Sequence, residues 1–336
     1  MTQPIHALVT GSTGYIGSRL VAELARAGVT VTATARNTEK LDRFDFPPEV
    51  GRVDLDVADA DSCREAFASA ARRGPGAGQP VTVAYFLVHS IGEGDFATHD
   101  LDSAKQFAAA AHDAGVTRVV YLGGLVPDDD ELSEHLQSRA DVGHALADTD
   151  VDLVWLRAAV ILGSGSTSFE LVRHIAERIP VIPIPTWMNH VICPVAVDDV
   201  LRYLVASADG SVPAGSYDIS NDDRPTYTQL IKAFAKDRKL RRLWLPFPPV
   251  PARLVALIAS WLTPLPRELT ADLIMSLPNS MTSSDRRIRQ FVPDPPEGLT
   301  STVDALSRSR IETPLRGVYA TTDPLLLTDT DPDWAH

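Results

Sequence analysis

Apolar positions in the first half of the chain fall into short runs separated by segments of helical period. The runs are rich in β-branched residues and cover 5–10, 29–35, 51–57, 81–88, 117–123 and 152–157. The segments between them include Ala-rich stretches in which apolar residues recur every three or four positions, as in 61–73, 103–115 and 133–147. This alternation predicts an α/β Rossmann fold, in which a doubly wound parallel sheet carries helices on both faces. Ligands of such sheets bind beyond the carboxyl ends of the strands.

The pattern changes after about residue 160. Helical periods continue at 166–180 and 197–208, and residues 215–220 can return one more strand to the sheet. Residues 222–310 contain helical stretches broken by proline-rich segments, which indicates a smaller, mostly helical C-terminal substrate lobe. The predicted division is a dinucleotide-binding domain at 1–163 completed by about 193–220, a substrate lobe at 164–192 and 221–311, and an extended or disordered tail at 312–336.

Composition narrows the range of partners. The 336 residues are 44% hydrophobic and 22% charged, which is ordinary for a globular protein. With 31 basic and 44 acidic residues the net charge is -13, which disfavours binding to nucleic acid. Cys63 and Cys193 stand far apart without neighbouring ligand residues, so neither a disulfide framework nor a zinc site is indicated. The first residues lack the pattern of an export signal, and we expect a cytoplasmic protein.

The most apolar later stretch is LVALIASWL at 254–262. It is about half as long as a membrane-spanning helix and is bracketed by prolines. We expect a helix that covers a core or a ligand cleft, with a weak peripheral membrane contact as the alternative.

A glycine turn follows the first predicted strand. The sequence Gly11-Ser12-Thr13-Gly14-Tyr15-Ile16-Gly17 lies between a strand and a helix whose Leu20 and Leu24 share an apolar face. Glycines allow the backbone to turn tightly and approach a pyrophosphate, and the helix N-terminus offers free N–H groups to the phosphates. The turn therefore predicts dinucleotide binding.

The end of the second strand predicts which dinucleotide is bound. An acidic residue there would bind the adenosine ribose hydroxyls, whereas a basic residue would accommodate a 2′-phosphate. The chain has Arg36 at this point and Lys40 shortly after it. Two cations within about one turn can hold a phosphate dianion, so NADP(H) is preferred to NAD(H).

Seven short motifs occur in a fixed order along the chain. They are VTGSTGYIG, ARNTEK, LDVADADS, YFLVHSIG, VVYLGGL, LRAAVILGSGS and VAVDDV, spread over about residues 5–230. Together they resemble the short-chain dehydrogenase/reductase superfamily, and specifically its atypical extended, NmrA-like branch. The resemblance implies that Asp56 and Val57 flank the adenine, although Asp54 and Leu55 fit the same motif. It also implies that three residues lie beside the nicotinamide ribose, namely Leu87, Val88 and His89.

The segment HLQSR, residues 135–139, falls where typical members of the superfamily carry Tyr-x-x-x-Lys. His135 and Arg139 take those two places, and Gly123 and Gly124 stand where a serine is usual. Arg139 can donate hydrogen bonds to ribose hydroxyls but keeps its proton. His135 can deliver a proton near neutral pH. Taken alone, the pair also fits the solvated face of a helix.

Two functions remain open. The first is an NADPH-dependent oxidoreductase acting on an apolar carbonyl, enone or quinone, with His135 and Arg139 as catalytic residues. The second is a non-catalytic module that senses NADPH and NADP+ and binds a regulatory protein partner. The loss of the usual Tyr and Lys favours the second, and it weakens a third reading, a sugar-nucleotide epimerase.

Overall fold

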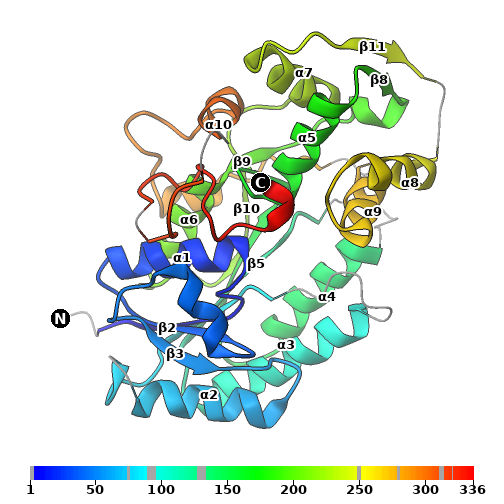
Figure 1. The fold of residues 1–336 in the computed structure, drawn as a ribbon. Helices are drawn as coiled ribbons and strands as arrows, with labels where there is room; N and C mark the ends of the chain where they lie inside the picture. Colours follow the sequence, from blue (N-terminus) through cyan, green and yellow to red (C-terminus); the bar gives the residue numbers. More distant parts are fainter. Residues whose placement is uncertain are drawn as a thin grey trace.

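A seven-stranded parallel sheet forms the centre of the molecule (Figure 1). The computed structural model describes residues 4–73, 76–88, 96–126, 134–247, 251–277, 281–309, 314–319 and 321–336. In spatial order the strands are β10 (Gly215–Ile219), β6 (Asp152–Ala158), β5 (Arg118–Gly124), β4 (Val83–Phe86), β1 (His6–Val9), β2 (Thr30–Ala35) and β3 (Gly51–Asp54). The strand order reverses between β1 and β4, which is where ligands bind in doubly wound sheets. The predicted Rossmann fold is confirmed, and β10 pairs with β6 as the returning strand.

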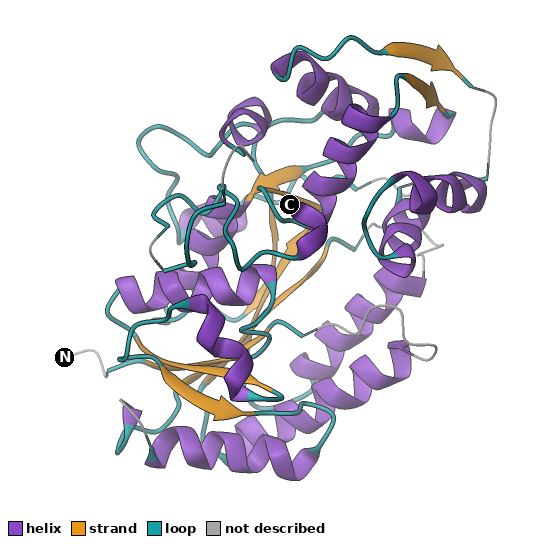
Figure 2. Ribbon diagram, in the orientation of Figure 1, coloured by secondary structure: helices purple, strands orange, loops and turns teal. Residues whose placement is uncertain are grey.

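Helices cover both faces of this sheet (Figure 2). One face carries α1 (Tyr15–Arg26) and α6 (Val197–Ala206), and the other carries α2 (Ala60–Arg72), α3 (Phe96–Asp113) and α4 (Glu134–Ala147). Strand β4 shows why both faces need cover. Val83 and Tyr85 lie in one hydrophobic core, whereas Ala84 and Phe86 lie in the other, because successive side chains alternate across a sheet.

The remaining elements form the smaller lobe. Its helices are α5 (Thr167–Arg178), α7 (Tyr227–Asp237), α8 (Ala252–Leu262), α9 (Arg267–Ser276) and α10 (Thr302–Arg308). Two short parallel pairs accompany them, β7 (Val160–Leu162) with β9 (Pro194–Ala196) and β8 (Val181–Ile184) with β11 (Leu243–Pro246).

Short 3-10 helices occur throughout the described ranges. They are η1 (Thr38–Phe44), which lies between β2 and β3, η3 (Thr186–Asn189), η4 (Arg287–Gln290) and η5 (Asp333–Ala335). Across the described ranges, no helix is long and apolar enough to cross a membrane.

Two segments differ from, or sharpen, the sequence prediction. The third strand ends at Asp54 rather than at Val57, because the backbone N–H of Asp56 donates to the hydroxyl of Ser62 at 2.9 Å instead of pairing with β2. The C-terminal tail is an irregular but packed segment rather than a free arm. Its carbonyl oxygens at Thr321 and Thr330 accept hydrogen bonds from Arg26 and Arg43, at 2.8 and 3.2 Å.

Candidate dinucleotide and substrate site

The glycine turn after β1 is closed so tightly that side chains do not fit. Gly11 has a φ of 64°, and the N–H of Gly14 donates to the Gly11 carbonyl at 2.8 Å. A Cβ atom on Gly17 would lie 2.1 Å from that same carbonyl oxygen, and one on Gly11 would lie 2.7 Å from the carbonyl oxygen of Leu87. The glycines therefore allow α1 to begin directly beneath the turn.

The N-terminus of α1 is left open for an anion. Its N-cap residue, Gly14, has no side chain to cap the helix, and the first turn contains no acidic residue. The first N–H groups and the positive end of the helix dipole therefore face the turn without a competing carboxylate. Ser12 has a different role, since its buried hydroxyl donates to the Val9 carbonyl at 2.8 Å and accepts from the Thr34 N–H at 3.1 Å. Its side chain joins β1 to β2.

A polar cavity of about 550 Å³ lies beside the turn, at the carboxyl ends of the central strands. Fifteen residues line it: Thr10, Gly11, Thr13, Thr34, Ala35, Arg36, Leu55, Asp56, Val57, Ala58, Phe86, Val88, His99, Asp100 and Ser103. Six of the predicted cofactor residues are among them. Lys40 is not, because it is exposed on η1. A dinucleotide fits these residues, since the cavity combines a glycine cradle with a cation at the end of β2.

The two acidic residues that fit the adenine motif lie in different places. The carboxylate of Asp54 accepts the Thr38 N–H at 2.8 Å and so holds the start of η1. Asp56 lies in the cavity lining, where its carboxylate accepts the Ala58 N–H at 3.1 Å. Asp56 and Val57 therefore line the polar cavity, whereas Asp54 does not, and their role beside the adenine stays a prediction.

A second cavity, of about 270 Å³, continues from the turn toward the smaller lobe. Tyr15, Ile16, Leu87 and Arg139 line it among the predicted residues. It is lined also by Leu122, Gly123, Gly124, Leu136, Ala158, Ala159, Ile161, Ser166, Thr167, Ser168, Leu269, Leu273 and Met281. This is the position expected for the nicotinamide, since it lies beyond β5 and β6 and joins the glycine turn.

Gly124 explains how Arg139 fits into this cavity. A Cβ atom at position 124 would lie 3.1 Å from the Cδ atom of Arg139. The backbone of α4 is held at this point because the Tyr121 hydroxyl donates to the Arg139 carbonyl at 3.0 Å. The absence of a side chain at Gly124, one of the two glycines at the place where the resemblance expects a serine, therefore leaves room for the Arg139 side chain.

Two predicted residues cannot be placed in the same way. His89 lies outside the described residues. Position 135 lies in the first turn of α4, one turn before Arg139, and its side chain is outside the described part. The proton-donor role of His135 stays a prediction. Tyr15 offers its ring rather than its hydroxyl, which is buried without a hydrogen-bond partner among the described residues. Burial raises the pKa of this hydroxyl above its usual value.

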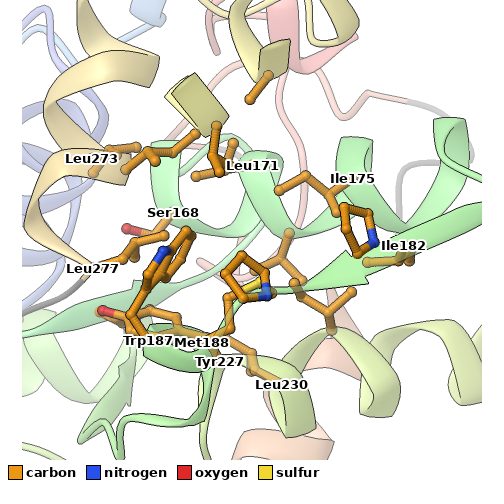
Figure 3. Close-up of a pocket in the computed structure, with 18 of the residues that line it drawn as sticks. Ser168, Leu171, Ile175, Ile182, Trp187, Met188, Tyr227, Leu230, Leu273 and Leu277 are labelled. Atoms are coloured by element: carbon orange, nitrogen blue, oxygen red, sulfur yellow. The ribbon is translucent and has the colours of Figure 1, made fainter. Parts of the chain in front are cut away.

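An apolar cavity of about 300 Å³ opens next to the second cavity (Figure 3). Its walls come from α5, α7, α8, α9, β8 and η3. They include Leu171, Val172, Ile175, Ile179, Ile182, Pro183, Trp187, Met188, Leu230, Ile231, Phe247, Val255, Ala259, Ile274 and Leu277. Polar side-chain atoms are few, and the lining hydroxyls are those of Ser168 and Tyr227. The residues at 254–262 thus cover a cleft on one face, as Val255 and Ala259 show.

The C-terminal tail packs against elements that belong to both parts of the site, namely α1 and the turn that leads into α5. Asp331 makes a two-pronged ion pair with Arg19 of α1, at 2.7 and 2.8 Å, and both side chains are buried. Its carboxylate also fills the space beside Gly165, in the turn that leads into α5. In the same turn the Gly165 N–H donates to Glu170 at 2.9 Å. Burial raises the pKa of Glu170 to about 7, partly offset by the charge of Arg173.

Sequence reasoning missed several residues of the site. Ser166, Thr167 and Ser168 begin α5 and line the second cavity. A signal for them existed, because a Gly- and Ser-rich segment follows β7 just as the glycine turn follows β1. The apolar walls gave no comparable signal, since Leu and Ile residues at helical spacing are ordinary core residues. The pairing of Arg19 with Asp331 joins positions 312 residues apart and had no local signature.

Comparison with known proteins supports the geometry. Residues 11–174 match the family model described as NAD(P)H-binding. A search of curated proteins found no match to the chain. Two enzymes with similar solved structures are a nucleoside-diphosphate-sugar epimerase from Staphylococcus aureus (TM-score 0.69, 14% identity) and a Citrobacter sp. triphenylmethane reductase complexed with NADP(H) (TM-score 0.68, 18% identity). The matches cover 90% and 91% of this chain, and 99% and 100% of those chains.

The UDP-glucose 4-epimerase from Thermotoga maritima is also similar, with a TM-score of 0.65 and 14% identity over 90% of this chain and 96% of that one. At such identities the structures show a shared fold. The family model shows an NAD(P)H-binding domain over residues 11–174.

Proposed function

We propose that the protein is an NADPH-dependent reductase of the NmrA-like branch that acts in the cytoplasm on an elongated, apolar carbonyl, enone or quinone. One observation carries the proposal. The apolar cavity and the cavity at the expected nicotinamide position share four lining residues, Ala159, Ser168, Leu273 and Met281. An apolar molecule in the apolar cavity can therefore present one end to a hydride donor in the second cavity, at the expected nicotinamide position.

The cofactor would be held by residues that line the polar cavity and the second cavity. The turn from Gly11 to Gly17 would bind the pyrophosphate, Asp56 and Val57 would flank the adenine, and Arg36 with Lys40 would bind the 2′-phosphate. Leu87 and Val88 would lie along the nicotinamide ribose. When bound, NADPH supplies a hydride.

The residues of α4 would complete the reduction. Arg139 would donate hydrogen bonds to the ribose hydroxyls and orient the ring. The substrate carbon would accept the hydride while its oxygen accepts a proton from the His135 imidazolium. Arg139, as a neighbouring cation, would lower the pKa of His135 and so make it a stronger acid. His135→Ala is then expected to lower turnover by roughly 100-fold to 10,000-fold.

The test uses two cavity-filling variants and a series of quinones and enones of increasing chain length. Ala159→Phe, at the junction, should lower kcat/KM for every substrate. Ala259→Phe, away from the junction, should affect only the long substrates. NADPH oxidation is followed by its absorbance. If no member of the series oxidises NADPH above background, the reductase proposal is wrong.

A regulatory module is the second candidate because Gly124, His135 and Arg139 replace the usual Ser, Tyr and Lys. In that case NADPH would bind without being consumed, and affinity for a protein partner would differ between NADPH and NADP+. The epimerase reading gains little support from the apolar cavity, since it offers few partners for sugar hydroxyls and a diphosphate.

A further inference from the structure

Exposed hydrophobic side chains gather on one part of the smaller lobe. The described residues include nine exposed large hydrophobic side chains, and six of them lie on β8, on β11 with the residue after it, and on α8. These six, which we call the apolar rim, are Val181, Leu243, Leu245, Phe247, Leu257 and Trp261. Trp261 is 72% exposed and Leu243 is 58% exposed. Apolar side chains concentrated in this way are typical of a binding surface rather than of ordinary exposed residues.

Backbone geometry explains why these side chains point outward together. Leu243 pairs with Val181 and Leu245 pairs with Pro183, so all four lie on the same face of the two-stranded sheet. On α8, Leu257 and Trp261 are one turn apart and share a face. The opposite face of the same helix, with Val255 and Ala259, lines the apolar cavity.

The apolar rim adjoins the opening of that cavity. Phe247 lines the cavity and is 48% exposed, and Pro183 lines it and is also exposed. The cavity therefore reaches the surface between β8 and α8, at the opposite end from its junction with the nicotinamide position. A ligand that enters here passes the apolar rim first.

Positive charge accompanies the apolar rim although the protein as a whole is acidic. Between residues 232 and 267 the sequence has eight Lys and Arg residues and one acidic residue, Asp237. The rest of the chain then has 23 basic and 43 acidic residues, from totals of 31 and 44. The eight cations are Lys232, Lys236, Arg238, Lys239, Arg241, Arg242, Arg253 and Arg267. Glu177 and Glu268 are the nearby carboxylates on α5 and α9.

Two of these cations lie beside aromatic residues. The Arg267 guanidinium lies 4.7 Å from the centre of the Trp261 ring, on the apolar rim. The Lys232 ammonium lies 5.4 Å from that of Trp244, which is on the other face of β11 and packs against the core. Lys236 and Arg241 are exposed. Arg242 is used structurally, because it donates to the carbonyls of Ala176 and Glu177 at the end of α5. Aromatic rings next to cations are the combination that suits the headgroup region of a membrane.

We propose that the apolar rim and its cations bind the surface of an anionic lipid membrane, and that the apolar cavity takes up its substrate from that membrane. The docking step stands on the exposed residues and their charge. The uptake step rests on the proposed function. Together they make the substrate class a lipid-soluble quinone or enone rather than a water-soluble carbonyl.

The test is cosedimentation of the full chain with phosphatidylcholine vesicles and with vesicles that also contain phosphatidylglycerol. We expect binding to the second kind, weakened by salt. Leu245→Ser with Trp261→Ser should reduce binding at least about tenfold, since both lose apolar area at the interface. Val303→Ser with Leu315→Ser is the matched control, because these side chains are exposed elsewhere and should leave binding unchanged.

A charge pair sharpens the test. Lys236→Gln with Arg241→Gln should lower the preference for phosphatidylglycerol, whereas Arg64→Gln with Arg72→Gln, exposed on α2, should not. NADPH binding checks that each variant is folded. Absence of binding to either vesicle overturns the proposal. So does a change of sedimentation coefficient in the Leu245/Trp261 variant with vesicle binding intact, which would assign the surface to a second copy of the chain.

The two proposals fail in different ways. Reduction of a short, water-soluble quinone without any vesicle binding would remove the membrane surface and keep the reductase. Vesicle binding without NADPH oxidation would keep the surface and remove the reductase.

Discussion

The polar and the apolar cavities of this protein are built in opposite ways. The polar cavity is lined mainly by short segments at the ends of β1, β2, β3 and β4, together with one face of α3. The apolar cavity takes its walls from residues 159 to 281, on elements that touch only after the lobe has folded. A phosphate needs backbone N–H groups and a cation in fixed positions, which a short motif supplies. An apolar ligand needs only a shape, which many sequences can enclose.

The C-terminal tail contacts both α1, beside the polar cavity, and the turn before α5, beside the apolar cavity. Breaking its buried ion pair should have the largest effect of the changes considered. Arg19→Met leaves the Asp331 carboxylate buried without its partner, and Asp331→Asn leaves the Arg19 guanidinium in the same state. Each should lower the free energy of unfolding by about 3 to 5 kcal/mol, measured in urea. The exposed pair of Arg64 and Asp61 is the control, where Arg64→Ala should cost less than about 1 kcal/mol. Equal effects at both sites would show that the tail does not brace the site.

The contrast between the cavities also sets what the sequence could predict. The strand segments, the glycine turn and Arg36 follow from local patterns, because apolar runs, glycines and a strand end are visible within about ten residues. The adenine motif fitted Asp54 as well as Asp56, and the structure distinguishes the two, because Asp54 accepts the Thr38 N–H whereas Asp56 lines the polar cavity. The bond joins the start of η1 to the end of β3 and has no signature in either segment.

The smaller lobe was predictable in class but not in detail. Helices were expected at 166–180 and 197–208, and α5 and α6 lie there. The β8 and β11 pair was not predicted, because its partners are about 60 residues apart and both contain proline. The exposed half of α8 could not be separated from its cavity-facing half, since both are apolar.

The second prediction tests whether the glycine turn tolerates a side chain at Gly17. Gly17→Ala would place a Cβ atom 2.1 Å from the Gly11 carbonyl oxygen and push α1 away from the turn. NADPH affinity should fall by at least about 100-fold in a calorimetric titration, since such overpacking costs a few kcal/mol. Ser18→Ala, the next residue on α1, should change affinity little. A Gly17→Ala protein that binds NADPH normally would show that the turn does not hold the pyrophosphate.

The third prediction concerns cofactor choice. Arg36 lines the polar cavity whereas Lys40 does not, so the two cations should contribute unequally. Arg36→Ala should weaken NADPH relative to NADH by about ten- to hundredfold, the range for a lost charge-assisted hydrogen bond. Lys40→Ala should have a smaller effect that fades with salt. Equal wild-type affinity for NADPH and NADH, measured by competition, would remove the assignment of both residues.

The smallest effect on NADPH binding is expected at Arg139, in the second cavity. Arg139 lines the second cavity beside Gly124, and it is the residue proposed to contact the ribose. Arg139→Ala should therefore weaken NADPH binding by about five- to tenfold, as expected for one hydrogen bond. The effect should appear equally in an enzyme and in a sensor, because the ribose contact is made before any chemistry. Gly124→Ser supplies the complementary variant. It restores the usual residue of the superfamily but intrudes on the Arg139 side chain, so it should weaken binding alone and have no further effect when combined with Arg139→Ala. Additive losses in the double variant would mean that Arg139 does not occupy the ribose position, and that α4 contributes only its apolar face to the cavity.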